Sequence, residues 1–553
     1  MIGPADIAVF TGPVHDESHV YIIVENKREA VEDGLEQLYS YLSPTKAPFG
    51  VWFNGVAVAH RSVHTDAPFF RVIPDIPKYG HTLDDVGRYK KSDLEPATEL
   101  RSVFETVHNY IYANQGLLKD ATFKEILKLL FIKLVDEKSS KAQCDFSITN
   151  AELQAVNEGD GDKFVARISK LFDRVKQEYR DVFEESEPLG LKPDCLAFAV
   201  SALQRYSLGR TDADVKGIAF QTFVGAYQRG DRGEFFTPSP ILQLVVAFLN
   251  PRDDEFVIDP ACGSGGFLVE TLRHVIARLE TERPDMTPAE RKDAVLRYAR
   301  TYIRGIDFNP DLAKVSKMYM VLYDDGHTGI ISEDSLSSTE QLNARSITSG
   351  AGPLDDEMFD VIITNPPFGT KGKVTSKERL SRFELGRTWK KTGGRYQPTA
   401  KLRPGGQTPE ILFIERCVQL LKPGGRLALV LPDGILTNPS LRYVRDYMVD
   451  KLSILAVVSL PDGTFRQSGM NPKTSVIFGV KRGTSAKELT EVFMCELDRL
   501  GYDLVKKTAP LTFKRGDDGG LIRDEDGHPI SDSEVPEAIE AFLAFKAGQE
   551  LSF

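Results

Sequence analysis

The sequence lacks the features that mark several specialised classes of protein. No stretch approaches the roughly 18 consecutive apolar residues of a membrane-spanning helix, and the opening MIGPADIAVF lacks the basic start and cleavage site of a secretory signal. The five cysteines are far apart and form no CxxC pair, which argues against a disulfide framework and a zinc site. The absence of a Walker motif argues against an ATP-driven motor. We therefore expect a cytoplasmic protein with reduced cysteines and no membrane contact.

The charge balance limits how this chain can contact nucleic acid. Its 80 Asp and Glu residues outnumber its 69 Lys and Arg residues, which gives a formal net charge of −11 at pH 7. Any contact with DNA must therefore come from a local basic patch or from another subunit. With 41% hydrophobic residues the chain is typical of a globular protein, and its length accommodates roughly three or four domains.

Four regions differ in their patterns. Residues 1–80 alternate short strands with one helix, and residues 81–230 show helical spacing of apolar residues. Residues 231–480 alternate apolar strands with helical stretches, which is typical of a doubly wound, Rossmann-like parallel sheet. Residues 481–553 are polar and charged. The sequence thus predicts an α/β fold whose large third domain is preceded by a helical domain and a small α/β unit, and followed by a tail.

A glycine-rich turn lies between a strand and a helix in the third region. In DPACGSGGFLVETL, Gly263, Gly265 and Gly266 allow the backbone to turn tightly and to approach a ligand closely. Asp307 ends the next strand, a position from which an acidic side chain commonly accepts hydrogen bonds from ribose hydroxyls, and Asp334 follows in a later loop. Together these residues predict a site for a nucleotide-like cofactor, although an ordinary structural turn is the alternative for each one.

Two prolines end the apolar strand FDVIITN. Pro366 and Pro367 donate no backbone hydrogen bond and hold φ fixed, so strand pairing must stop there. The carbonyl oxygens of Asn365 and Pro366 are left available to another partner, and an aromatic residue, Phe368, follows them. The pattern indicates that a ligand uses this loop.

The order of the motifs carries a resemblance to a known family. EFFTP (residues 234–238), DPACGSGG, GIDFNP, EDSL and NPPFG follow one another as in the N6-adenine DNA methyltransferases. The chain most closely resembles the methylation subunits of type I restriction-modification systems, from the helical region through KTSVIF (residues 473–478). The resemblance implies a methyltransferase that takes its methyl group from S-adenosyl-L-methionine and acts on an adenine flipped out of duplex DNA.

The resemblance also implies roles for individual residues. Asn365 and the Pro366 carbonyl would accept the two hydrogens of the adenine amine, Pro367 would help to present them, and Phe368 would stack on the base. Two acceptors on one amine orient its lone pair toward a sulfonium methyl without a strong general base. The implied cofactor residues are Phe236, Thr237 and Pro238 with Asp259, Ala261, Gly263, Ser264, Gly265 and Gly266 at the methionine part, Asp307 at the ribose and Asp334 at the adenine.

A basic segment, residues 371–403, follows the proline loop. It contains 11 Lys or Arg residues against two Glu, with aromatic residues interleaved. A solvated surface is the alternative, but the position beside the loop favours phosphate contact, and we expect the segment to become ordered only on DNA. The residues expected to bind DNA are Lys371, Lys373, Lys377, Arg379, Lys390, Lys391 and Arg395.

The first 80 residues hold a second group of polar residues. Asp6, Glu25, Lys27 and Gln37 resemble the PD-(D/E)xK nuclease core at the N-terminus of type I restriction subunits. Asp6 and Glu25 could hold Mg²⁺, and the lysine could orient a water. The chain begins at the second strand of that core, however, so an inactive DNA-binding or scaffold module is the alternative that we favour.

We infer partner subunits from the domains that the sequence does not contain. The residues after KTSVIF are too few for a domain that reads several base pairs, so we expect a separate specificity subunit and a possible restriction subunit as partners, with duplex DNA as the substrate. Three other functions stay open: an enzyme that both cuts and methylates DNA, a non-catalytic assembly subunit, and a protein methyltransferase acting on a glutamine amide. Phe368 and the basic segment favour DNA over protein.

Overall fold

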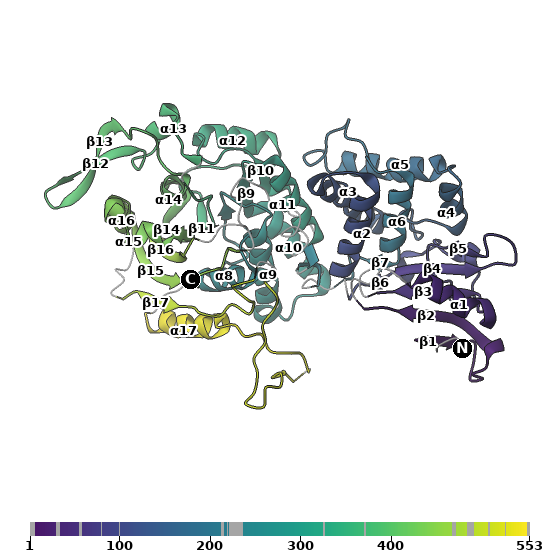
Figure 1. Ribbon diagram of the computed structural model, residues 1–553. Coiled ribbons are helices and arrows are strands. Elements are labelled where there is room, and N and C mark those ends of the chain that lie inside the picture. Colours follow the sequence, from purple (N-terminus) through teal and green to yellow (C-terminus); the bar gives the residue numbers. More distant parts are fainter. Residues whose placement is uncertain are drawn as a thin grey trace. The chain divides into compact units, whose positions relative to one another are not determined.

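The computed structural model groups the chain into two compact units, residues 1–228 and 229–553 (Figure 1). The described residues are 6–28, 34–54, 58–78, 80–98, 100–211, 215–217, 219–220, 236–323, 327–369, 372–466, 472–483, 491–506, 509–525 and 527–549. Each unit is described by itself. The finer division into four domains stays a prediction.

A five-stranded sheet forms the first part of unit 1–228. Its strands lie in chain order: β1 (Ile7–Phe10), β2 (Val20–Asn26), β3 (Phe49–Phe53), β4 (Val58–Val63) and β5 (Phe70–Val72). The pair β2 and β3 is parallel because helix α1 (Leu35–Thr45) connects them, whereas the other neighbours are antiparallel. Leu38 and Leu42 of α1 pack against Ile23 and Trp52 of the sheet, which forms a small core.

Helices make up most of the remainder of this unit. They are α2 (Leu100–Gln115), α3 (Lys119–Lys138), α4 (Asn150–Asn157), α5 (Asp162–Glu178) and α6 (Pro193–Leu203), with a short parallel pair β6 (Glu95–Pro96) and β7 (Tyr206–Ser207). Helix α4 begins with a capping box between Thr149 and Glu152, and α6 begins with a proline at its first turn. The sheet and the helices are joined by hydrogen bonds from Gln154 to the Val72 carbonyl and from Ser201 to the Pro74 carbonyl.

An eight-stranded sheet is the centre of unit 229–553. The strands are β8 (Val257–Asp259), β9 (Ile303–Asp307), β10 (Ile330–Ser332), β11 (Phe359–Thr364), β14 (Leu421–Pro432), β15 (Leu452–Ser459), β16 (Thr474–Lys481) and β17 (Phe493–Glu496), in the order β10-β9-β8-β11-β14-β16-β15-β17. The predicted doubly wound sheet is confirmed, with one difference: β16 is antiparallel to both of its neighbours.

Helices connect these strands and cover the sheet (Figure 1). They are α8 (Ser239–Leu249), α9 (Gly266–Glu282), α10 (Pro288–Thr301), α11 (Pro310–Leu322), α12 (Thr339–Thr348), α14 (Pro409–Leu420), α15 (Asp433–Thr437), α16 (Arg442–Lys451) and α17 (Val535–Gly548). From β8 the chain proceeds to β9 and β10 on one side, then returns to β11 on the other side. The strand order therefore reverses between β8 and β11, and the carboxyl ends of strands at such a reversal are where doubly wound sheets bind ligands.

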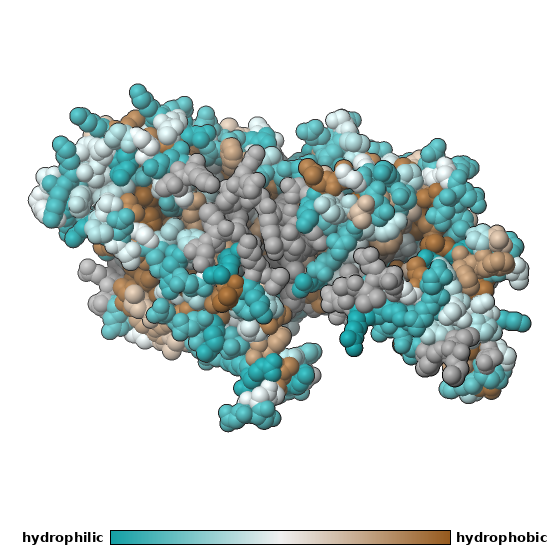
Figure 2. All heavy atoms as spheres, viewed as in Figure 1, coloured by the Kyte–Doolittle hydropathy of each residue, from teal (hydrophilic) through white to brown (hydrophobic). Residues whose placement is uncertain are grey.

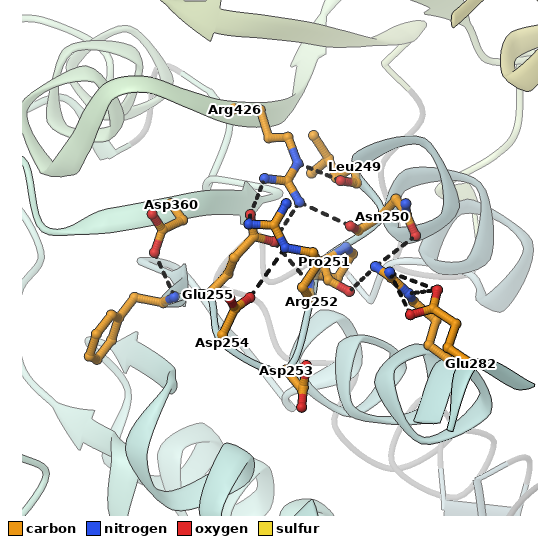
Figure 3. A network of polar contacts seen from close by, with 12 residues as sticks. Leu249, Asn250, Pro251, Arg252, Asp253, Asp254, Glu255, Glu282, Asp360 and Arg426 are labelled. Atoms are coloured by element: carbon orange, nitrogen blue, oxygen red, sulfur yellow. Dashed lines mark hydrogen bonds and ion pairs between the residues drawn. The ribbon is translucent and has the colours of Figure 1, made fainter. Parts of the chain in front are cut away.

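A buried polar network fixes helix α8 to the sheet (Figure 3). Arg426 lies in β14. Its guanidinium donates to the carbonyl oxygens of Leu249 and Asn250, at 2.5 and 3.0 Å, where α8 ends. The same guanidinium pairs with Glu255 at 2.7 Å, just before β8. A buried charge is tolerated where it is paired and hydrogen-bonded, so this network holds the C-terminal end of α8 against two strands.

The basic segment is folded over most of its described length. It contains α13 (Lys377–Ser381) and a hairpin of β12 (Arg387–Thr392) and β13 (Arg395–Leu402), which projects from the unit (Figure 1). Trp389 packs against Tyr443 and Tyr447 of α16, with ring centroids 5.7 and 6.3 Å apart. The expectation that the segment becomes ordered only on DNA therefore differs from the structure, because an aromatic contact anchors the hairpin to a helix.

Strand β17 and helix α17 also pack against the other elements of this unit. Strand β17 pairs with β15, and Phe542 of α17 stacks on Phe248 of α8 with ring centroids 3.9 Å apart. Among the described helices of the whole chain, none has both the length and the apolar character that crossing a bilayer requires.

Candidate active site

A cavity of about 460 Å³ opens at the carboxyl ends of the strands where the strand order reverses. Its lining comes from the loops after β8, β9, β10 and β11, from the segment before α8, and from α13 and α14. The predicted residues that line it are Phe236, Ala261, Gly263, Ser264, Asp307, Asp334, Asn365, Pro367 and Arg379. The fold thus brings together residues that are widely separated in the sequence.

The glycine turn is shaped by its contacts with a neighbouring helix. Gly265 has a φ of 87° and precedes the first turn of α9. A Cβ at this position would lie 2.4 Å from Ser316 Oγ on α11, so only glycine fits without displacement. The amide groups of the first turn of α9 follow this turn, and such groups attract negatively charged parts of a ligand.

Two carboxylates organise the loops after β8 and β9. Asp307 accepts from the Gly263 amide and from the Asn309 amide, each at 2.8 Å, and so ties the glycine turn to the end of β9. Asp259 accepts from the Ala261 amide at 2.9 Å and is fully buried. Burial raises the pKa of the Asp259 carboxyl to about 7, because the charged form loses its hydration.

Asp334 is engaged on both of its oxygens. One oxygen accepts from the Leu336 amide at 3.0 Å, which is the Asx turn that we considered as the alternative role for this residue. The other oxygen pairs with Arg379 at 2.8 Å. Arg379, which we expected to face DNA, therefore lines the cavity and neutralises Asp334.

In the proline loop, the side-chain oxygen of Asn365 is unusual in its hydrogen bonding. Asn365 donates from Nδ2 to Thr237 Oγ1 at 3.1 Å, while its Oδ1 is buried and has no hydrogen-bond partner among the described residues. A buried acceptor without a partner is costly, and it indicates a place for a donor from a ligand. Phe368 lies edge-on to Phe465, with ring centroids 6.5 Å apart.

Helix α14 supports the far end of this loop. Glu410 accepts from the Gly369 amide at 3.4 Å, and burial raises the pKa of the Glu410 carboxyl. We did not predict Glu410 as a site residue. A glutamate near the start of a helix commonly serves only to stabilise the helix through its dipole, and the sequence alone does not distinguish that role from a role in the site. The contact between Thr237 and Asn365 was also missed, since no sequence signal links residues 128 positions apart.

The other residues predicted to bind DNA lie outside the cavity lining. Lys373 and Lys377 are exposed, as are Lys390, Lys391 and Arg395 on the hairpin. In Figure 2 the surface over β12 and β13 is coloured mainly teal and white, so it ranges from hydrophilic to intermediate hydropathy. Lys371 lies outside the described residues, and so do the first two residues of the EFFTP motif.

The predicted polar group of unit 1–228 is also assembled. Lys27 pairs with Glu25 and donates to Gln37 at 2.6 Å, Gln37 donates to the Tyr41 hydroxyl at 2.8 Å, and Asp6 accepts from the backbone amide of Asn26 at 2.7 Å. Within the described ranges, no group of three or more His, Cys, Asp or Glu side chains could hold a metal ion. The Mg²⁺ site at Asp6 and Glu25 therefore gains no support from the structure.

Two family models match the chain. The model described as "N-6 DNA Methylase" matches residues 211–517, and the model described as "Type I restriction enzyme R protein N terminus (HSDR_N)" matches residues 2–77. The predicted resemblance to both families is thus confirmed.

Several curated relatives are methylase subunits of type I restriction enzymes, and another is a type II restriction enzyme and methyltransferase. The StySPI methylase subunit of Salmonella potsdam and the EcoKI methylase subunit of Escherichia coli K12 are each 27% identical over 306 residues, which is 54% of this chain and 50% of theirs. The type II restriction enzyme and methyltransferase RM.BcgI of Heyndrickxia coagulans is 23% identical over 315 residues, 56% of this chain and 42% of that protein. The chain therefore spans about half the length of the curated relatives that it matches.

Solved structures share the fold. A type I restriction-modification methyltransferase subunit from Streptococcus thermophilus has a TM-score of 0.52 at 16% identity, covering 82% of this chain and 94% of that one. A modification subunit from Vibrio vulnificus YJ016 has a TM-score of 0.50 at 17% identity, covering 79% and 96%. With a family model matching more than half of its length and the motifs assembled around one cavity, this chain belongs to the N-6 DNA Methylase family.

Proposed function

We propose that this protein transfers a methyl group from S-adenosyl-L-methionine to N6 of adenine in duplex DNA, within a restriction-modification or related defence system. The family implies methylation of DNA with this cofactor. The finer proposal is carried by the buried Oδ1 of Asn365, which has no hydrogen-bond partner in the part of the chain that the structure describes. An acceptor on a residue that lines a nucleotide-sized cavity suits the exocyclic amine of a flipped adenine.

The cavity fits the proposed cofactor in size and in chemistry. Its volume of about 460 Å³ is within the range of small-molecule sites. Asp307 would accept from ribose hydroxyls and Asp334 from the adenine amine, while the glycine turn and the start of α9 would bind the methionine part. When bound, S-adenosyl-L-methionine supplies an electrophilic methyl on a sulfonium sulfur.

The proline loop would bind and orient the target base. Asn365 Oδ1 and the Pro366 carbonyl would accept the two amine hydrogens, so that the nitrogen lone pair is directed toward the methyl group. Phe368 would stack on the base and offset part of the few kcal/mol that flipping costs. The exposed lysines and arginines of the hairpin would contact DNA phosphates.

Sequence choice would come from a separate specificity subunit. The relatives are named as subunits of multi-chain enzymes, and a restriction subunit is a further partner of this kind of system. The basic hairpin supports backbone contact rather than base reading, because lysines and arginines on phosphates carry no sequence information.

The experiment that tests the proposal is transfer of labelled methyl from S-adenosyl-L-methionine to mixed-sequence duplex DNA, with and without the products of neighbouring genes, followed by nucleoside analysis. We expect N6-methyladenine from the wild type and at least a hundredfold less from Asn365→Ala, which loses a transition-state contact. Cofactor binding measured by calorimetry should be retained in Asn365→Ala. The exposed helical variant Asn157→Ala serves as the control and should act as the wild type. Cofactor binding by the wild type without transfer to DNA would reject the proposal and favour an assembly role or a protein substrate.

A second function, DNA cleavage by unit 1–228, has one observation in its favour: Glu25, Lys27 and Gln37 are in contact. Nicking of supercoiled plasmid that requires Mg²⁺ and is lost in Glu25→Gln would establish it. Intact plasmid under all conditions would leave an inactive module.

A further inference from the structure

The side-chain amide of Asn365 can bind the base amine in only one of its two orientations, the one in which Oδ1 faces the base. Its oxygen and nitrogen ends have nearly the same shape, but only Oδ1 can accept a hydrogen from an amine. A rotation of 180° would present an NH₂ group to the base amine, and two donors would then face each other. In the structure Nδ2 donates to Thr237 Oγ1 at 3.1 Å. In the rotated orientation the hydroxyl would have to donate its hydrogen to Oδ1, so this contact selects the productive orientation when that hydrogen is given to the cofactor instead.

We infer that Thr237 is a positioning residue that holds the Asn365 amide in its productive orientation, an inference that rests on the proposed function. A threonine hydroxyl offers two acceptor lone pairs and one hydrogen. While it accepts from Asn365, its own hydrogen stays available for the cofactor side of the cavity, where the resemblance places Thr237. One hydroxyl can therefore serve the base and the cofactor together.

Thr237 is presented by a rigid element. Pro238 caps α8 with a φ of −60°, and Thr237 immediately precedes it. The other end of α8 is held by Arg426 through the carbonyls of Leu249 and Asn250. The apolar residues of the helix are buried along its length, so the hydroxyl is fixed relative to β11 and the loop that follows it.

Steady-state kinetics distinguish an orienting role of Thr237 from a role in cofactor binding alone. If Thr237 only bound the methionine part, its loss would raise the KM for S-adenosyl-L-methionine and leave kcat unchanged at saturation. If it orients Asn365, its loss lowers kcat at saturating cofactor, because part of the population presents the wrong end of the amide. Valine has nearly the shape of threonine and lacks the acceptor, whereas serine keeps it.

The kinetic test uses full-length Thr237→Val and Thr237→Ser with the partners that methyl transfer requires. We expect Thr237→Val to lower kcat about tenfold, the size of one lost hydrogen bond and its desolvation, and Thr237→Ser to stay within about twofold of the wild type. Thr281→Val, at an exposed position on α9, controls for the substitution itself. An unchanged kcat in Thr237→Val, or a change confined to the KM for the cofactor, would overturn the inference.

A second measurement reads the amide directly and needs neither DNA nor turnover. In protein labelled with ¹⁵N only at asparagine, the side-chain NH₂ signal that disappears in Asn365→Ala belongs to Asn365. This signal should shift and exchange faster with solvent in Thr237→Val but not in Thr237→Ser. An Asn365 signal that is the same in the wild type and Thr237→Val rejects the inference, whereas absence of methyl transfer by the wild type rejects the proposed function.

Discussion

At the scale of single residues, the buried Asp259 gives the site a pH-dependent stability. Its folded pKa of about 7 lies above the ordinary value of 3.8, because burial favours the protonated form. Protonation of this carboxyl therefore stabilises the folded chain fully below about pH 4, and the contribution is lost as the pH rises through 7. The shift corresponds to roughly 4 kcal/mol at alkaline pH.

We expect Asp259→Asn, which keeps an oxygen for the Ala261 amide, to be more stable relative to the wild type at pH 8 than at pH 5. The reason is that the asparagine has no charge to desolvate. Thermal unfolding midpoints of both proteins without cofactor, at both pH values, measure the difference, which should amount to several degrees. Asp285→Asn, an exposed position, should show no such pH dependence. Equal differences at pH 5 and pH 8 would contradict the raised pKa.

The sequence could identify the site residues that lie at the ends of predicted strands, because a strand end has a known place in a parallel sheet. Asp259, Asp307 and Asn365 each end or follow a predicted strand, and parallel strands bring such ends to one edge of the sheet. The pairings of Asn365 with Thr237 and of Asp334 with Arg379 depend on how loops pack in three dimensions. A single sequence contains no signal for such contacts, and the roles of these residues in catalysis stay a prediction.

At the scale of elements, the hairpin β12–β13 has two different faces. Trp389 and Lys391 point to the side that packs toward α16, since they alternate with Lys390 along the strand. Lys390 and Arg395 project from the opposite side and are exposed. The sequence indicated the charge and the interleaved aromatics, but the anchoring of Trp389 on a later helix was not predictable, because it joins segments that are not adjacent in the chain.

We expect the double variant Lys390→Ala/Arg395→Ala to weaken DNA binding and to reduce the slope of log affinity against log salt concentration by about 1.8, since each lost phosphate contact contributes about 0.9. Titrations with mixed-sequence duplex at several salt concentrations measure the slope. Lys292→Ala/Arg297→Ala, which removes the same charge from the exposed side of α10, is the matched control. If both pairs of substitutions reduce the slope equally, net charge rather than the hairpin determines the binding.

At the scale of the whole molecule, β17 and α17 are part of the folded unit 229–553. We expected a polar tail after residue 480, and the apolar residues of α17 were overlooked because charged stretches precede them. Phe542 is fully buried between Phe248 and Phe478, whereas its neighbour Leu543 is 46% exposed. Helix α17 therefore helps to hold α8 in place through the contact between Phe542 and Phe248.

We expect Phe542→Ala to destabilise unit 229–553 by about 3–5 kcal/mol, the usual result of removing a buried aromatic side chain, and Leu543→Ala to have little effect. Thermal unfolding monitored by proteolysis of each unit tests this. A lowered midpoint should appear in fragments from residues 229–553 and not in those from residues 1–228. Equal stability of the two variants would mean that α17 is not part of the folded core.

The ion pair between Asp334 and Arg379 has a consequence for the order of events. Under the proposed function, a cofactor amine that takes the place of the guanidinium on the Asp334 oxygen would free a positive charge on α13, in a chain whose net charge is −11. A released arginine beside the hairpin strengthens attraction to a polyanion. Reciprocity then requires that the polyanion, by drawing the arginine away, makes room for the ligand. Binding of the small molecule and binding of the nucleic acid would thus be cooperative, each favouring the other before any chemistry occurs.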